Sequence, residues 1–100
     1  MRSRFDPRDG KIAKLELFGT NQKKEIEASK KVIQFLMQYE KAKPEEIAEA
    51  TGVYYRTVLK KVRILKNVRL LRKRGYSYEI TPNFKEFLVF LSLHGVNIDE

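Results

Sequence analysis

Two short helical patterns that meet at Gly52 constrain the fold of this chain more than any other feature of its sequence. The first pattern covers residues 44–51 and begins at Pro44, a residue that loses no needed hydrogen bond in the first turn of a helix. Gly52 then permits the positive φ of a tight turn. The second pattern covers residues 54–67. Its apolar residues recur within about 60° of one another around the helix: Val58, Val62 and Leu65.

The first 20 residues carry weaker patterns. Residues 1–10 hold three arginines, a proline and a glycine, which predicts a mobile arm. Residues 11–18 fit a short helix capped by Asp9, and they fit a strand equally well; we favour the helix. We therefore assign residues 1–20 to an N-terminal arm or short extra helix.

The rest of the chain completes one small domain over residues 21–95. Apolar side chains repeat along one face of residues 22–40, which predicts a long helix. After the pair of helices around Gly52, two β runs (69–73 and 76–81) flank Arg74-Gly75, and we expect a tight hairpin turn there. The predicted fold class is α+β, mostly α, with a three-helix core, a two-stranded β-hairpin and a C-terminal helix.

The last helix begins at Thr81-Pro82 and stops at Gly95, and apolar residues surround most of its circumference. A chain of 100 residues is too short to encircle such a helix, so a second copy is expected to cover it. The sequence thus predicts a homodimer whose interface is formed by Phe84, Phe87, Leu88, Phe90 and Leu91. Residues 96–100 are expected to be a frayed tail.

The positive charge of the chain is concentrated in one segment. The formal net charge is +8, and residues 56–74 contain nine basic side chains without one acid. A charge imbalance of this kind points to a polyanionic partner such as DNA or RNA. The basic residues lie on the predicted helix 54–67 and on the hairpin that follows it.

The order of helices, glycine turn and hairpin resembles the winged helix-turn-helix regulators of the arsenic-repressor and multiple-antibiotic-resistance-repressor type. The resemblance covers roughly residues 26–94 and is carried by IAEATG, VYYRTVLKKVRIL and LLRKRGYSYEITP. It implies a positioning helix, a recognition helix at about 54–67 and a wing at about 70–81. The family usually has glycine just after the recognition helix, where this chain has Val68 or Arg69, and often glycine where Phe84 stands.

A recognition helix with a basic outer face fits the major groove of B-DNA, where base edges differ in their donors and acceptors. We expect Arg56 and Lys60 to reach base edges or phosphates, and the other cations to meet phosphates. Arg72, Lys73 and Arg74 would follow the backbone or enter the minor groove. The full expected DNA-binding set is Tyr55, Arg56, Thr57, Lys60, Lys61, Arg63, Lys66, Arg72, Lys73 and Arg74.

The tyrosines near this segment have two interpretations each. Tyr54 and Tyr55 can stack on bases or sugars, or pack inside the protein; the helical geometry favours packing for Tyr54. Tyr76 and Tyr78 share one face of the predicted strand and are expected to pack against the core rather than to stack on bases.

Several function classes find no support in the sequence. It contains no cysteine and one histidine, so thiolate chemistry is excluded and any metal site would rest on carboxylates. We see no nucleophile–base pair, cofactor motif or effector-binding pattern, and expect no enzyme activity. The apolar stretch 84–93 is too short to span a bilayer. We expect a cytoplasmic, nucleoid-associated protein.

The leading hypothesis is a sequence-specific transcription regulator that binds double-stranded DNA as a homodimer. One alternative is an architectural, chromatin-type protein with low sequence specificity. Another is a winged-helix module that contacts only other proteins. Such a module would need an apolar or acidic recognition helix, and the helix 54–67 is basic. The charge pattern alone does not distinguish a sequence-specific regulator from an architectural protein.

Overall fold

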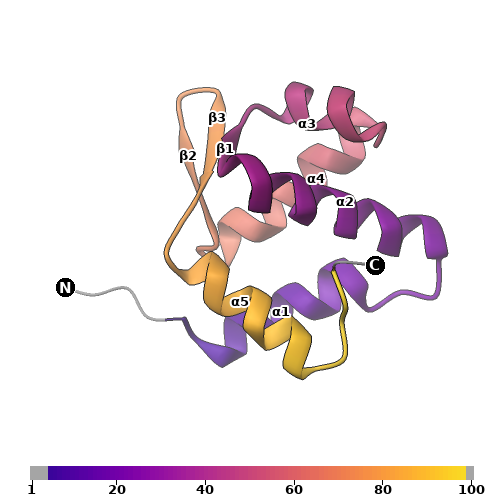
Figure 1. The fold of residues 1–100 in the computed structure, drawn as a ribbon, viewed down its shortest axis with the longest axis vertical. Helices are drawn as coiled ribbons and strands as arrows, with labels where there is room; N and C mark the ends of the chain where they lie inside the picture. The colour runs from indigo at the N-terminus through magenta and orange to yellow at the C-terminus, as the bar shows by residue number, and fades with distance from the viewer. Residues whose placement is uncertain (1–4, 99–100) are drawn as a thin grey trace.

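The computed structural model describes residues 5–98, which form an α+β fold that is mostly helical (Figure 1). Within this part of the chain, five helices accompany one antiparallel sheet of three strands. In chain order they are α1 (Pro7–Phe18), α2 (Lys23–Tyr39), β1 (Lys41–Ala42), α3 (Pro44–Thr51), α4 (Tyr55–Asn67), β2 (Leu71–Arg74), β3 (Ser77–Ile80) and α5 (Asn83–Leu93). Helices α1 and α5 lie together at one end of the molecule, and the β2–β3 hairpin lies toward the other.

Helix α1 begins earlier than the sequence suggested. Asp6, not Asp9, caps it: the Asp6 side chain accepts a hydrogen bond from the backbone N–H of Arg8 at 2.9 Å, and Pro7 occupies the first helical position. The preference for helix over strand in residues 11–18 is confirmed. The predicted mobile arm is wrong for residues 7–10, which are helical, while residues 1–4 lie outside the described part.

Helix α1 belongs to the core because small and apolar residues recur on one of its faces. Gly10, Ala13 and Leu17 are buried. The backbone carbonyl of Leu17 also accepts a hydrogen bond of 2.7 Å from the buried Ser29 hydroxyl of α2. The two helices are therefore joined by apolar contact and by a satisfied polar pair.

Helices α3 and α4 match the expected bounds closely. Gly52 adopts φ +76° and its N–H bonds the carbonyl of Ala48, which ends α3 as predicted. The Glu46 carboxylate accepts from the backbone N–H of Lys43 at 2.7 Å and stabilises the start of the helix. In α4 the predicted apolar face is buried against the other helices: Val58, Val62 and Leu65.

The sheet has one more strand than expected. Strand β1 has only two residues and no pattern of its own, but it pairs with β3, which becomes the central strand in the order β1-β3-β2. The hairpin turn falls at Gly75-Tyr76, one residue later than predicted. This shift removes Tyr76 from the strand face, and its side chain is 84% exposed, so its predicted packing is wrong; Tyr78 is buried as expected.

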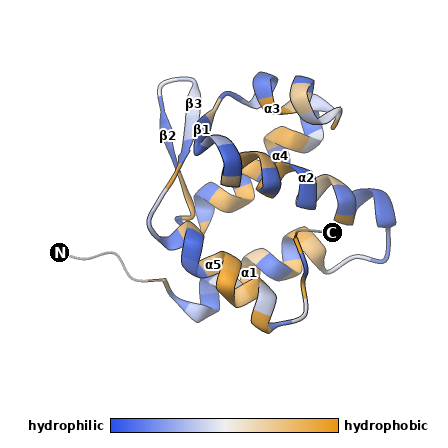
Figure 2. Cartoon of the chain, viewed as in Figure 1, coloured by the Kyte–Doolittle hydropathy of each residue, from blue (hydrophilic) through white to orange (hydrophobic). Residues whose placement is uncertain are grey.

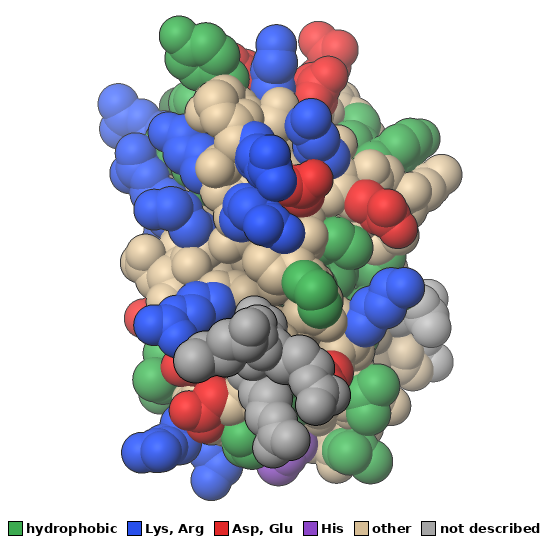
Figure 3. Space-filling model, turned by 90° about the vertical axis from the view of Figure 1, so that its left-hand side faces the viewer, with side chains coloured by type: hydrophobic (Ala, Val, Ile, Leu, Met, Phe, Trp, Pro, Cys, Tyr) green, Lys and Arg blue, Asp and Glu red, His purple; other side chains and the backbone are tan. Residues whose placement is uncertain are grey.

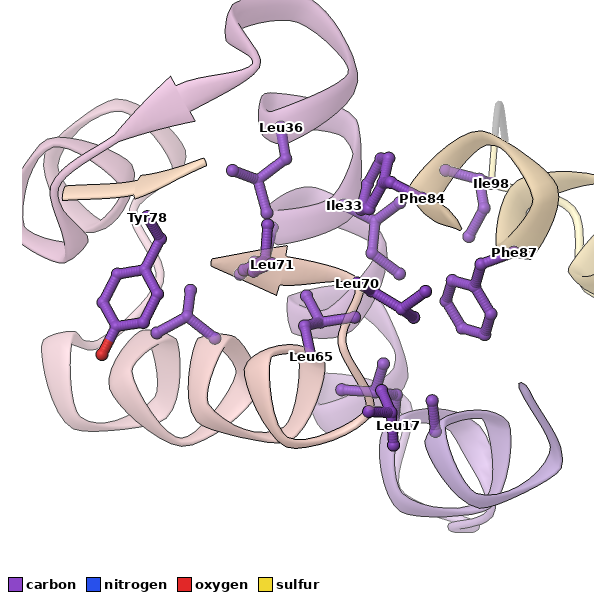
Figure 4. Close-up of a cluster of buried hydrophobic side chains, with 14 of the residues drawn as sticks. Leu17, Ile33, Leu36, Leu65, Leu70, Leu71, Tyr78, Phe84, Phe87 and Ile98 are labelled. Carbon is purple, nitrogen blue, oxygen red and sulfur yellow. The ribbon is translucent and has the colours of Figure 1, made fainter. Parts of the chain in front are cut away.

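The expectation that α5 needs a second subunit to bury its apolar residues is wrong for most of them. Figure 2 shows α5 as a strongly hydrophobic helix beside α1. Its apolar residues pack on α1, on Phe5 and on the central core, where Phe84 and Phe87 lie near Ile33, Leu70 and Ile98 (Figure 4). Four of the five predicted interface residues are buried within the chain: Phe84, Phe87, Phe90 and Leu91. The fifth, Leu88, is half-buried.

The segment after α5 is also more ordered than a frayed tail. Gly95 adopts φ +83° and turns the chain back toward the core. Ile98 is buried, Val96 packs partly against the core, and the side-chain amide of Gln34 donates a hydrogen bond to the carbonyl of Ile98. The tail prediction therefore fails for residues 96–98, and residues 99–100 lie outside the described part.

Candidate nucleic-acid interface

Helix α4 presents a straight stripe of polar side chains on the side opposite its buried residues. Arg56, Lys60, Arg63 and Asn67 follow one another at spacings of four, three and four residues, and all four are exposed. Because 3.6 residues make one turn, these spacings keep the side chains on one face over the length of the helix. The structure thus brings together Arg56, Lys60 and Arg63 of the predicted set.

Lys61 does not belong to this stripe. Its side chain is 2% exposed, and its Nζ lies 2.9 Å from Oε1 of Glu25 on α2. One residue after Lys60, the helix has rotated by about 100°, which carries Lys61 to the buried side beside Val58 and Val62. The prediction that Lys61 meets phosphate is therefore wrong, since burial and pairing with Glu25 withdraw its ammonium group from the surface.

The pairing also changes the acid–base behaviour of Glu25. The hydrogen bond from Lys61 and its positive charge lower the pKa of Glu25 below its ordinary value of 4.5. Burial opposes this shift, and the charge of Lys60 makes the smallest contribution to lowering the pKa. The carboxylate is therefore the form that the folded protein stabilises. The sequence carries no local sign of this pair, because 36 residues separate its members.

The other predicted residues of α4 lie around the edges of the stripe. Tyr54, expected to pack, is 72% exposed, while Tyr55 is exposed to a lesser degree. Lys66 is exposed on one flank. Thr57 is half-buried on the other flank, where it lines a hollow together with side chains at the start of α2. The prediction that Tyr54 packs inside the protein is thus wrong. Thr57 is less accessible to a binding partner than the exposed side chains of α4.

The three cations of the hairpin do not act as one group. Because side chains alternate along a strand, Lys73 shares the inner face of the sheet with Tyr78, and its Nζ lies 6.0 Å from the centre of that ring. Arg72 and Arg74 lie on the outer face. Their Nε atoms are 3.4 Å and 3.2 Å from Oε1 of Glu79. This oxygen atom is shielded from solvent.

Two hollows flank the stripe of α4. One, of about 520 Å³, lies between α1 and α4, with Leu59 and Ile64 among the cations of the stripe and Glu16 on α1. The other, of about 220 Å³, lies between α4 and the inner face of the hairpin. Arg63 of α4 and Lys73 of β2 line this second hollow together with Tyr55 and Tyr76. Arg63 and Lys73 therefore belong to one continuous surface, which Glu45 of α3 also lines.

Several residues of this surface were not predicted from the sequence. Leu59 lines both hollows, and Tyr76 is exposed at the hairpin turn. The signal for Leu59 was present as an apolar residue between the cations of α4. The roles of Glu25 and Glu79 depend on contacts between elements, and no spacing in the sequence announces them.

Metal centres and membrane-spanning helices find no geometric basis in residues 5–98. Over that range, no group of three or more histidine, aspartate or glutamate side chains is placed to hold a metal ion. Nor does any helix in the described part of the chain have the length and apolar character needed to cross a membrane. No family model matches the chain, and a search of curated proteins found no relative of it.

Proposed function

We propose that this chain is a winged helix-turn-helix protein that binds double-stranded DNA in a sequence-specific manner and regulates transcription. The observation that carries the proposal is the exposed stripe of Arg56, Lys60 and Arg63 on α4, held outward by a buried apolar face. A cationic helix of this kind fits the major groove, and the shorter α3 supports it from behind across the Gly52 turn.

The backbone between α4 and β2 also supports the resemblance to winged-helix regulators. Arg69 adopts φ +64°, a conformation that favours glycine. In those regulators a glycine usually stands just after the recognition helix, where this chain has Val68 or Arg69. A residue with positive φ at this junction is in keeping with the glycine that the resemblance implies, and the hairpin and α4 line one hollow.

The hollow between α4 and the hairpin suggests how the contacts are divided. If α4 lies in the major groove and the inner face of the hairpin faces the adjoining backbone, one DNA strand must pass between α4 and the hairpin. Arg63 and Lys73 line that hollow and are assigned to phosphate. Arg56 and Lys60 lie farther along the outward stripe and are assigned to base edges, where an arginine can pair with guanine through two hydrogen bonds.

A homodimer remains part of the proposal, although on different residues from those expected. The buried residues of α5 are no longer available, but both terminal helices keep apolar side chains at the surface: Ile12, Leu15, Val89 and Leu93. Sedimentation equilibrium of the free chain tests this part of the proposal. If the chain is a monomer at concentrations where it binds DNA, the homodimer part of the proposal is refuted and the DNA-binding assignment is unaffected.

The salt dependence of duplex binding tests the main assignment. The logarithm of the affinity should fall by about 0.9 per phosphate contact for each tenfold rise in salt. We expect Lys73→Gln to reduce this slope by about 0.9, the contribution of one phosphate contact. Lys85→Gln, which removes an exposed charge from α5, is the matched control and should leave the slope unchanged. Equal slopes for the two variants would refute the assignment, as would a flat slope for the wild type.

A second candidate, an architectural protein with low sequence specificity, is favoured by the cations that the hairpin carries on its outer face. Selection of bound duplexes from a random pool separates the two functions. A recurring motif that weakens on Arg56→Gln supports the regulator, whereas bound sequences without any motif support the architectural protein.

A further inference from the structure

The outer face of the hairpin sheet carries a second group of cations, separate from the stripe on α4. The pairing register places Lys41 of β1 and Arg72 of β2 on either side of Glu79 in the central strand. Arg74 reaches the same carboxylate from the end of β2. Figure 3, which views the molecule from the hairpin side, shows Lys and Arg side chains gathered over this end of the molecule, with acidic side chains among them.

A hollow extends this group toward the base of the hairpin. Arg69 and Arg72 line a space of about 220 Å³ together with Thr81 and Pro82. The Thr81 hydroxyl donates to the carbonyl of Arg69 at 2.7 Å and holds that turn in place. We refer to Lys41, Arg69, Arg72 and Arg74 as the outer basic face; two of its four cations, Arg72 and Arg74, pair with Glu79.

This face points away from the surface assigned to the first duplex. Neighbouring residues of a strand project to opposite sides of the sheet, so Lys73 looks toward α4 while Arg72 and Arg74 look outward. A duplex seated on α4 and the inner side of the hairpin therefore leaves the outer basic face open. The side chains of Arg72 and Arg74 are exposed by half or more, in agreement with an accessible surface.

We propose that the outer basic face binds the phosphate backbone of a second DNA duplex, so that one molecule can bridge two DNA segments. This inference rests on the proposed function of α4. The ion pairs to Glu79 do not prevent it, because Arg72 and Arg74 approach Glu79 through Nε and their side chains stay exposed by half or more. A guanidinium group has five N–H donors, so each arginine can also donate to a phosphate. Because both Nε atoms lie within 3.4 Å of one carboxylate oxygen, the two guanidinium groups are neighbours on this face.

A capture experiment tests the proposal. One duplex is attached to beads and saturated with the protein, and retention of a second, labelled duplex is measured at low salt. We expect the wild type to retain it and Arg72→Gln/Arg74→Gln to lose about tenfold or more of this capture, because two phosphate contacts are removed. The double variant should still bind the first duplex and should lose less first-duplex affinity than Arg56→Gln/Lys60→Gln, so the bead duplex is saturated with each protein before capture is measured. Thermal melting verifies that it is folded.

A second variant makes the test independent of any loss of folding. Glu79→Gln removes the carboxylate at the centre of the outer basic face, and we expect capture of the second duplex to increase. Three results would overturn the inference: equal capture by Arg72→Gln/Arg74→Gln and wild type, no capture by a wild type that binds the bead duplex, or a loss of first-duplex affinity equal to that of Arg56→Gln/Lys60→Gln. Failure to bind even the bead duplex would instead refute the proposed function itself.

Discussion

Lys61 of α4 and Glu25 of α2 form an ion pair across the helical core, with 2.9 Å between Nζ and Oε1. The lysine is almost fully buried, while the carboxylate remains about one-third exposed. The pair joins α4 to the first turn of α2, and it faces away from the exposed stripe of α4. Its presence separates two neighbouring lysines, Lys60 and Lys61, that look equivalent in the sequence.

Removing one partner of this pair should destabilise the fold. Glu25→Gln leaves the buried Lys61 ammonium without an opposite charge, and we expect the free energy of unfolding to fall by about 1–3 kcal/mol. Lys61→Met removes the buried charge and keeps an apolar side chain of similar length, so its effect should be smaller. Urea unfolding of the two variants checks this order, and a larger loss for Lys61→Met would contradict it.

The contribution of the pair should depend on pH in a defined direction. The pKa of Glu25 is lowered in the folded protein, so the unfolded chain takes up the proton at a higher pH than the folded one. The stabilisation is therefore complete above the ordinary pKa of 4.5 and is lost as the pH falls through the lower, folded value. The stability difference between wild type and Glu25→Gln should narrow over that acidic range in pH-dependent urea unfolding. A difference that stays constant there would be contrary to the assignment.

The two adjacent lysines should differ in DNA binding. Lys60→Gln removes an exposed cation from the stripe and should weaken duplex binding and its salt dependence. Lys61→Met removes a cation that already faces Glu25, so binding should change little once the fraction of folded protein is taken into account. Fluorescence anisotropy titrations at several salt concentrations compare the two. Equal losses would mean that Lys61 leaves its buried site to meet DNA.

Helix α1 should be part of the cooperative core and not an appendage. Leu17 is buried, and its helix packs on α2, α4 and α5. Leu17→Ala should lower the free energy of unfolding by about 2–5 kcal/mol, as the loss of a buried leucine usually does. Leu15→Ala, a change of the same kind at an exposed position of the same helix, is the control and should have little effect at protein concentrations where the chain is monomeric. Similar effects of the two substitutions in thermal or urea unfolding would show that α1 is not docked as described.

The turn between α4 and β2 should prefer glycine. Arg69 is held at φ +64°, where a side chain with a Cβ is strained, and glycine is not. We expect Arg69→Gly to be more stable than Arg69→Ala by about 1 kcal/mol, because the two variants lack the same charge and differ only in the Cβ. Thermal unfolding of both proteins measures the difference. Greater stability of the alanine variant would indicate that this turn does not adopt the left-handed conformation.

The success of the sequence-based predictions followed the range of the interactions involved. The bounds of α3, the Gly52 turn and the buried face of α4 were predicted correctly, since each follows from neighbouring residues. The hairpin was found, but its turn was misplaced by one residue, which put Tyr76 on the wrong side. Strand β1 was missed because two residues carry no periodic pattern, and only pairing with β3 makes them a strand.

The sequence by itself determined the helical periods, the Pro44 and Gly52 boundaries and the concentration of charge between residues 56 and 74, all of which depend on local backbone preference and residue spacing. Only the tertiary structure decided which element covers which face. It buried Lys61 against Glu25, covered α5 with α1, and placed Lys73 and Arg72 on opposite sides of the sheet. Such choices depend on contacts between residues far apart in the chain, whose relative positions no local pattern encodes.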